Sequence, residues 1–136
     1  MKANLKKILS LAALGMTLLA TTVPTWAGMK NTSEVSVITS QLNYYVRGSM
    51  AGARYSADDQ QRIECVAIAS TNPFSPIVQC SATDSAGNYA TCVSTDPKLQ
   101  EVVQSMTDSS SIYFEVERAK GNCKYLQIYN SSELLK

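Results

Sequence analysis

The chain has 136 residues with 12 basic and 11 acidic side chains, no histidine and four cysteines. Such a length suits a single small domain. The basic residues of the region after the leader are scattered singly and lack the stripe that is typical of nucleic-acid-binding proteins, so nucleic acid is not an expected partner.

The N-terminal segment has the three parts of a secretory signal peptide. Three lysines precede a short apolar run over residues 8–20, and Ala27 ends a stretch suited to cleavage. The run is shorter than the roughly 20 apolar residues that span a bilayer. We therefore expect residues 1–27 to be a signal peptide and residues 28–136 to be a secreted or periplasmic domain without membrane association.

Strands separated by loops are predicted for the first half of this domain. Residues 28–33 are small and polar and are expected to be disordered. Residues 35–46 are rich in Val, Ile and Tyr and predict one strand or two shorter ones, which end at a loop over residues 48–52. A helical turn is expected at residues 56–59, followed by a strand over residues 62–69 and a proline-containing loop.

The clearest local pattern is a β-hairpin of residues 77–84 and 88–95. Its loop of three residues ends in Gly87, which suits a type I turn followed by a left-handed residue. Counting outward from this loop places Cys80 opposite Cys92.

A helix is predicted to begin at Asp96 and Pro97, because aspartate caps a helix N-terminus and proline fits the first helical position. It runs to about Met106. One face of it is apolar and carries Leu99, Val102, Val103 and Met106. Strands over residues 111–117 and 124–129 follow and predict a second hairpin.

Alternation along the strands indicates which face is buried. On the three middle strands, the side that carries the cysteines is apolar and mostly small, and the other side is polar. The sequence therefore predicts a single α+β domain, mainly β, with an antiparallel sheet of five or six strands and one helix packed on the cysteine-bearing face. Cys123 lies two residues before Tyr125, so alternation would place it on the side of Tyr125 and not on the core side with Leu126. A bulge or turn near Gly121 is therefore expected to turn it towards the core.

Two disulfides are expected, because Cys65, Cys80, Cys92 and Cys123 lie in an exported chain and lack the close pairs of zinc sites. In a meander of the three middle strands, Cys65 and Cys92 would be about 9 to 10 Å apart, beyond the reach of a disulfide. Two patterns remain: Cys65–Cys80 with Cys92–Cys123, or Cys80–Cys92 with Cys65–Cys123. We favour the first pattern, because Cys80 and Cys92 form a hydrogen-bonded pair in which a direct bridge is strained.

A row of tyrosines lies on the side of the last hairpin that faces away from the core. Tyr113, Tyr125 and Tyr129 each offer a flat apolar ring with a polar tip, which can bind a sugar ring or a peptide. Cross-strand tyrosine pairs also stabilise exposed sheets without any ligand. The functional hypothesis is a binding surface for an unidentified protein or carbohydrate.

No catalytic constellation is recognisable in the sequence. Histidine is absent, the thiols are expected to be oxidised, and the motifs of serine hydrolases and phosphate-binding loops are missing. Asp58 and Asp59 are interpreted as solvating a loop, and Glu115 and Glu117 as an exposed strand face. We expect a non-enzymatic protein without metal or cofactor.

Several short motifs resemble a family of short secreted bacterial proteins of unknown function with four cysteines. The similarity extends over Gly48 to Arg54, Ser56-Ala57-Asp58, Ile63-Glu64-Cys65, Cys80 to Asp84 with Gly87, Cys92 with Asp96-Pro97, Ile112-x-Phe114 and Gly121-x-Cys123. Ser94 stands where this family is expected to have a threonine. The resemblance implies one exported four-cysteine domain and transfers no activity.

A second resemblance concerns the segment from Ser49 to Tyr55. It is similar to the Gly-Ala-Arg-Tyr loop of periplasmic C-type lysozyme inhibitors, in which a loop serine enters the lysozyme cleft. The tryptophan and Lys-Gly segment that should follow is replaced by residues 56–59. The resemblance implies an alternative function, lysozyme inhibition through Ser49 and Arg54.

Overall fold

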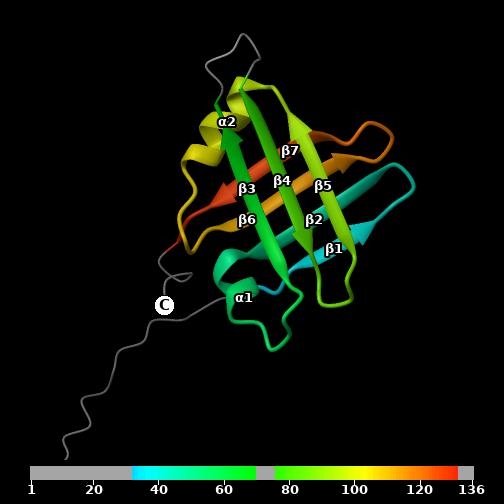
Figure 1. Ribbon diagram of the computed structural model, residues 1–136, viewed down its shortest axis with the longest axis vertical. Helices are drawn as coiled ribbons and strands as arrows, with labels where there is room; N and C mark the ends of the chain where they lie inside the picture. The colour runs from blue at the N-terminus through cyan, green and yellow to red at the C-terminus, as the bar shows by residue number, and fades with distance from the viewer. Residues whose placement is uncertain (1–31, 70–75, 132–136) are drawn as a thin grey trace, which may run out of the picture.

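The computed structural model describes residues 32–69 and 76–131 (Figure 1). The signal peptide predicted for residues 1–27, most of the segment 28–33 that is expected to be disordered, and most of the proline-containing loop lie outside these ranges. Within them, no helix is long and apolar enough to cross a membrane.

Seven strands form one mixed sheet in the order β1-β2-β6-β7-β5-β4-β3. The strands are β1 (Ser36–Thr39), β2 (Asn43–Ser49), β3 (Arg62–Ile68), β4 (Ile77–Thr83), β5 (Tyr89–Ser94), β6 (Ser111–Glu117) and β7 (Asn122–Tyr129), and the helices are α1 (Met50–Arg54) and α2 (Pro97–Gln104). Neighbouring strands are antiparallel except β5 and β7, which pair in parallel. The prediction of a mainly β domain is confirmed, whereas the prediction of five or six strands, all antiparallel, is wrong. The prediction of one helix is also wrong: α1 lies where a loop was expected, and residues 56–59, where a helical turn was expected, contain a bend.

The extra strand arises from a tight turn inside the N-terminal Val, Ile and Tyr-rich segment. Ser40 donates its backbone N–H to the Asn43 carbonyl oxygen at 2.8 Å, and its hydroxyl accepts from the Asn43 N–H at 3.0 Å. Leu42 is left exposed at the tip. The turn divides this segment into β1 and β2, which pair antiparallel with Val37 opposite Val46.

The sheet folds into two halves that enclose the core. The half formed by β3, β4 and β5 crosses in front of the half formed by β1, β2, β6 and β7 (Figure 1). The two halves are joined at β5 and β7 by one residue pair, Val93 with Asn122, and by the bond from the Val93 N–H to the Gly121 carbonyl at 2.9 Å. Buried side chains from both halves form one cluster, which contains Val46, Ile63, Val78, Cys80, Ala82, Ala90, Cys92, Ile112, Phe114, Val116 and Leu126.

Helix α2 forms as predicted at its N-terminus. The Asp96 carboxylate accepts a hydrogen bond from the Lys98 N–H at 2.9 Å, and Pro97 occupies the first turn. The apolar face packs against the core, with Val103 buried. The helix contacts β3, β4 and β7 at one end of the molecule. It therefore covers only part of the cysteine-bearing face, and the second half of the sheet covers the rest.

The irregularity expected near Cys123 is a β-bulge in β7. Cys123 lies opposite Val116, whereas Tyr125 lies opposite Glu115, so Lys124 is an extra residue between them. The bulge turns Cys123 towards the core, where it is 9% exposed, and leaves Tyr125 on the surface at 47%. The prediction of a local irregularity is confirmed, at a position slightly later in the chain than expected.

Candidate functional site

The disulfides are Cys65–Cys80 and Cys92–Cys123, with Cα atoms 4.0 Å and 4.9 Å apart. This confirms the favoured pairing. The Asp84 N–H donates to the Asn88 carbonyl at 3.0 Å, so these two residues form a hydrogen-bonded pair. Hydrogen-bonded and non-hydrogen-bonded pairs alternate along a hairpin, and Cys80 and Cys92, four residues further along each strand, are therefore also a hydrogen-bonded pair. On its other side Cys80 therefore forms a non-hydrogen-bonded pair with Cys65, in which the side chains lie closer together.

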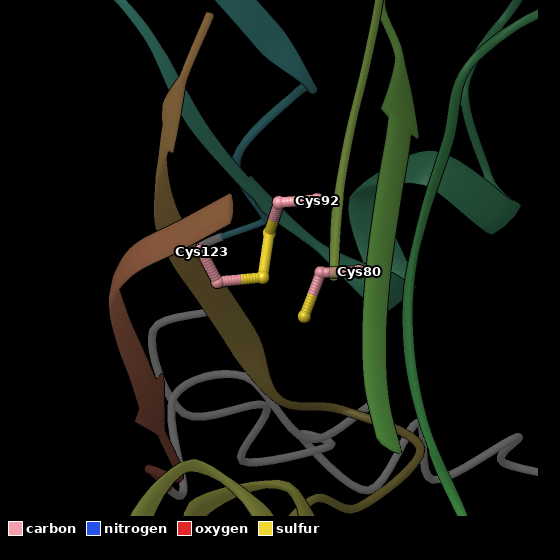
Figure 2. Close-up of side chains that lie close together, drawn as sticks. All are labelled: Cys80, Cys92 and Cys123. Atoms are coloured by element: carbon pink, nitrogen blue, oxygen red, sulfur yellow. A yellow bond between two sulfur atoms is a disulfide. The ribbon is translucent and has the colours of Figure 1, made fainter. Parts of the chain in front are cut away.

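The two disulfides lie side by side in the core. The Sγ atoms of Cys80, Cys92 and Cys123 are all within 4.8 Å of one another, and all three residues are buried (Figure 2). Such a group of thiolates would suit a soft metal ion. Here every one of these sulfurs is engaged in a disulfide, and the thiolate is the form that binds metals.

The second candidate site is a surface on the outer side of β2, β6 and β7, which we name the tyrosine face. Its members lie in cross-strand register and project away from the core: Tyr45, Arg47, Tyr113, Glu115, Tyr125, Gln127 and Tyr129. The rings of Tyr113 and Tyr125 are in contact, with centroids 5.7 Å apart and an interplanar angle of 65°. Tyr129 lies on the same side at the end of β7, opposite Ser111, and is 50% exposed.

Hydrogen bonds along each strand hold the rings of the tyrosine face. The Tyr113 hydroxyl donates to Glu115 Oε1 at 2.6 Å. This hydrogen bond, together with burial, raises the pKa of Tyr113 to about 12, because ionisation would place two negative charges side by side. The Tyr125 hydroxyl donates to Gln127 Oε1 at 3.5 Å. The hydroxyl of Tyr113 is thus neutral and held in place, and ring surface is what the face offers to a partner.

Tyr45 and Arg47 were not identified from the sequence as members of this face. Both alternate outward along β2, but β2 pairs with β6, which lies more than 60 residues further along the chain. Arg47 also borders an open cleft of about 590 Å³, lined by Ser33, Glu34, Val35, Ser36, Asp84 and Ser85. The tyrosine face therefore continues into a cleft at the Arg47 side.

Asp84 stands at the hairpin end of this cleft. Burial alone would raise the pKa of its carboxyl, but hydrogen bonds from the Asn88 side chain and from the backbone N–H groups of Asn88 and Ala86 outweigh burial and hold that pKa below its usual value. The carboxylate is thus a structural acceptor that shapes the hairpin loop.

Ser49 and Arg54, the residues implied by the lysozyme-inhibitor resemblance, differ in accessibility. Ser49 is fully buried, accepts a hydrogen bond from the Gly52 N–H at 2.8 Å as the N-cap of α1, and donates to the Ser33 carbonyl at 3.1 Å. A Cβ atom on Gly52 would lie 2.1 Å from that same carbonyl oxygen. The segment is thus packed against the chain at Ser33, whereas Arg54 is exposed at the end of α1.

Comparisons with known proteins give no relative: no protein-family model, no curated protein and no solved structure matches this chain. The resemblance to short secreted four-cysteine proteins therefore stays a prediction. The protein is a mainly β, two-disulfide domain with a tyrosine-rich outer face.

Proposed function

We propose that the protein is an exported, non-enzymatic binding module that contacts a partner protein through the tyrosine face. The observation that supports this most is the alignment of Tyr45, Tyr113, Tyr125 and Arg47 on adjacent strands of a disulfide-linked sheet. Tyrosine and arginine are enriched in protein interfaces and at their energetic hot spots, because they bury a large contact area and keep a polar group available. A rigid sheet lowers the entropy that is lost on binding.

A protein partner is favoured over a carbohydrate by the orientation of the rings. A sugar stacks on a flat aromatic surface, whereas Tyr113 and Tyr125 meet edge to face at 65° and do not form one plane. The two rings form an uneven surface beside the cleft at Arg47, and such a surface suits a folded protein or peptide. A carbohydrate ligand is the competing outcome of the experiment below.

Export and the absence of catalysis are parts of the same proposal. Disulfides persist in oxidising compartments outside the cytoplasm, which supports a secreted or periplasmic location. The carboxylate that the sequence singled out in a loop, Asp58, accepts hydrogen bonds from the backbone of Gln60 and from the backbone and side chain of Gln61. These bonds lower its pKa, whereas a general acid needs a raised one.

The experiment compares how much partner protein is captured by the oxidised mature domain and by two variants of it. Replacing Tyr113, Tyr125 and Tyr129 together by serine is expected to abolish capture of an exported partner protein. The matched control replaces by serine Tyr89 on β5 and Val66 on β3, which are 57% and 43% exposed in the other half of the sheet, and is expected to retain capture. Captured proteins are quantified by mass spectrometry, and circular dichroism checks that both variants are folded.

Two results would contradict the proposal. Equal capture by the wild-type domain and the triple-tyrosine variant would remove the tyrosine face from the interaction. Binding to a glycan array that depends on the same tyrosines, without any protein captured, would assign the face to carbohydrate. Inhibition of a C-type lysozyme that is lost on Arg54→Ala would instead support the alternative function, which the burial of Ser49 disfavours.

A further inference from the structure

The disulfide Cys92–Cys123 spans the place where the two halves of the sheet meet. Between β5 and β7 the sheet has a single paired position, Val93 with Asn122. The bond from the Val93 N–H to the Gly121 carbonyl adds one further contact at 2.9 Å. The covalent link from Cys92 to Cys123 therefore reinforces a junction with few backbone hydrogen bonds, and we name this junction the β5–β7 seam.

The disulfide Cys65–Cys80 has a different position. It joins β3 to β4, which are already held by a ladder of seven paired residues from Arg62–Thr83 to Ile68–Ile77. The strand β3 forms an edge of the sheet. Opening of this edge strand alone brings a reductant to Cys65–Cys80 while β4, β5 and the β5–β7 seam stay paired.

The sulfur of Cys80 connects the two disulfides. It lies within 4.8 Å of both Sγ atoms of the Cys92–Cys123 bridge, whereas Cys65 is not part of this close group of three. Figure 2 shows the Cys80 sulfur beside that bridge, with the three side chains converging from neighbouring strands. The distance is short enough for reaction after a small side-chain movement.

We propose that Cys80 is an exchange centre that passes reduction from the edge disulfide to the β5–β7 seam. A dithiol or phosphine reductant first gives two electrons to Cys65–Cys80, which becomes two thiols while the reductant is oxidised. The Cys80 thiolate then attacks one sulfur of Cys92–Cys123. A new disulfide forms from Cys80, the old disulfide breaks, and the sulfur that was not attacked leaves as a thiolate.

The exchange step itself consumes no further reductant, because one disulfide is broken and one is formed. Attack on Cys92 gives Cys80–Cys92 and releases Cys123. These two residues lie opposite each other in the β4–β5 hairpin as a hydrogen-bonded pair, in which a direct bridge is strained, so this product is transient and is trapped by alkylation of the Cys123 thiolate. The seam then loses its covalent link while β3, β4 and β5 stay paired. Loss of one disulfide at the sheet edge thereby loosens the β5–β7 seam.

The test uses two single-cysteine removals that differ only in which thiol is left. Cys65→Ser leaves Cys80 free beside the bridge, and Cys80→Ser leaves Cys65 free outside the group of three. Each folded variant is incubated at pH 8 with an alkylating reagent, then unfolded in acid, labelled with a second reagent and mapped by peptide mass spectrometry. In Cys65→Ser the first label is expected on Cys123 or Cys92, and in Cys80→Ser it is expected on Cys65 alone.

Labelling of Cys80 alone in the Cys65→Ser variant would overturn the proposal. So would transfer of label to Cys92 or Cys123 in the Cys80→Ser variant, because the route would then not pass through Cys80. If either variant fails to fold, the unmutated protein is reduced with less than one equivalent of a phosphine, and its thiols are alkylated at pH 8 before the acid quench. Molecules in which Cys65 and Cys123 are alkylated together, with Cys80 joined to Cys92, are expected, and their absence among singly reduced species contradicts the exchange.

Discussion

Removing the two disulfides one at a time is expected to have unequal effects on stability. The bridges close segments with sequence separations of 15 and 31 residues. On the chain-entropy account these loops stabilise the folded protein by about 3 and about 3.7 kcal/mol. All four cysteines are buried, so replacing a pair by alanine removes similar packing in both cases. Cys92→Ala with Cys123→Ala is therefore expected to lose at least about 0.6 kcal/mol more than Cys65→Ala with Cys80→Ala.

The β5–β7 seam increases this difference, because only one residue pair remains there when the Cys92–Cys123 link is gone. Urea denaturation of the two double variants measures the free energies of unfolding, and amide hydrogen exchange at Val93 reports the seam directly. Faster exchange at Val93 is expected in the variant without Cys92 and Cys123. Equal free energies, or a larger loss in the variant without Cys65 and Cys80, would show that the seam is not the weaker junction.

Three further predictions concern single side chains. Gly52→Ala is expected to destabilise the protein by about 3 kcal/mol or more in urea denaturation, because its Cβ would lie 2.1 Å from the Ser33 carbonyl oxygen. Glu115→Gln is expected to lower the pKa of Tyr113 from about 12 towards its ordinary value of 10.0, which an ultraviolet titration of tyrosinate detects. Asp84→Ala is expected to cost about 2 kcal/mol at neutral pH. Because the folded pKa of Asp84 is below its unfolded value of 3.8, this cost should fade as the pH drops below that value.

Features that depend on neighbours in the chain were predictable. The three-residue loop ending in Gly87, whose φ is 81°, sets the β4–β5 hairpin, and the observed pairs of Cys80 with Cys92 and Ala82 with Ala90 follow from it. Because hydrogen-bonded and non-hydrogen-bonded pairs alternate along this hairpin, Cys80 and Cys92 form a hydrogen-bonded pair that disfavours a direct bridge. This favours the disulfides that are observed. The Asp96–Pro97 start of α2 is equally local, since one capping side chain and one fixed φ angle decide it.

Features that depend on distant partners were not predictable in the same way. The parallel pairing of β5 with β7 requires the chain to return after α2 and β6, and a single residue pair leaves no pattern in either segment. The division of the N-terminal segment into β1 and β2 is local, and the sequence left it open as one of two alternatives, because the turn from Ser40 to Asn43 is not one of the common glycine-containing hairpin turns. The strand count and the mixed character of the sheet were missed for these reasons.

The tyrosine face combines both cases. Alternation in the last hairpin correctly places Tyr113 and Tyr125 on one side, because β6 and β7 are adjacent in sequence and in space. Tyr45 and Arg47 join them only because β2 lies on the other side of β6. A tyrosine pair that merely stabilised its own hairpin would need no such extension. The addition of an exposed arginine and a third ring from a distant strand, next to a cleft, is what makes a binding surface the stronger interpretation.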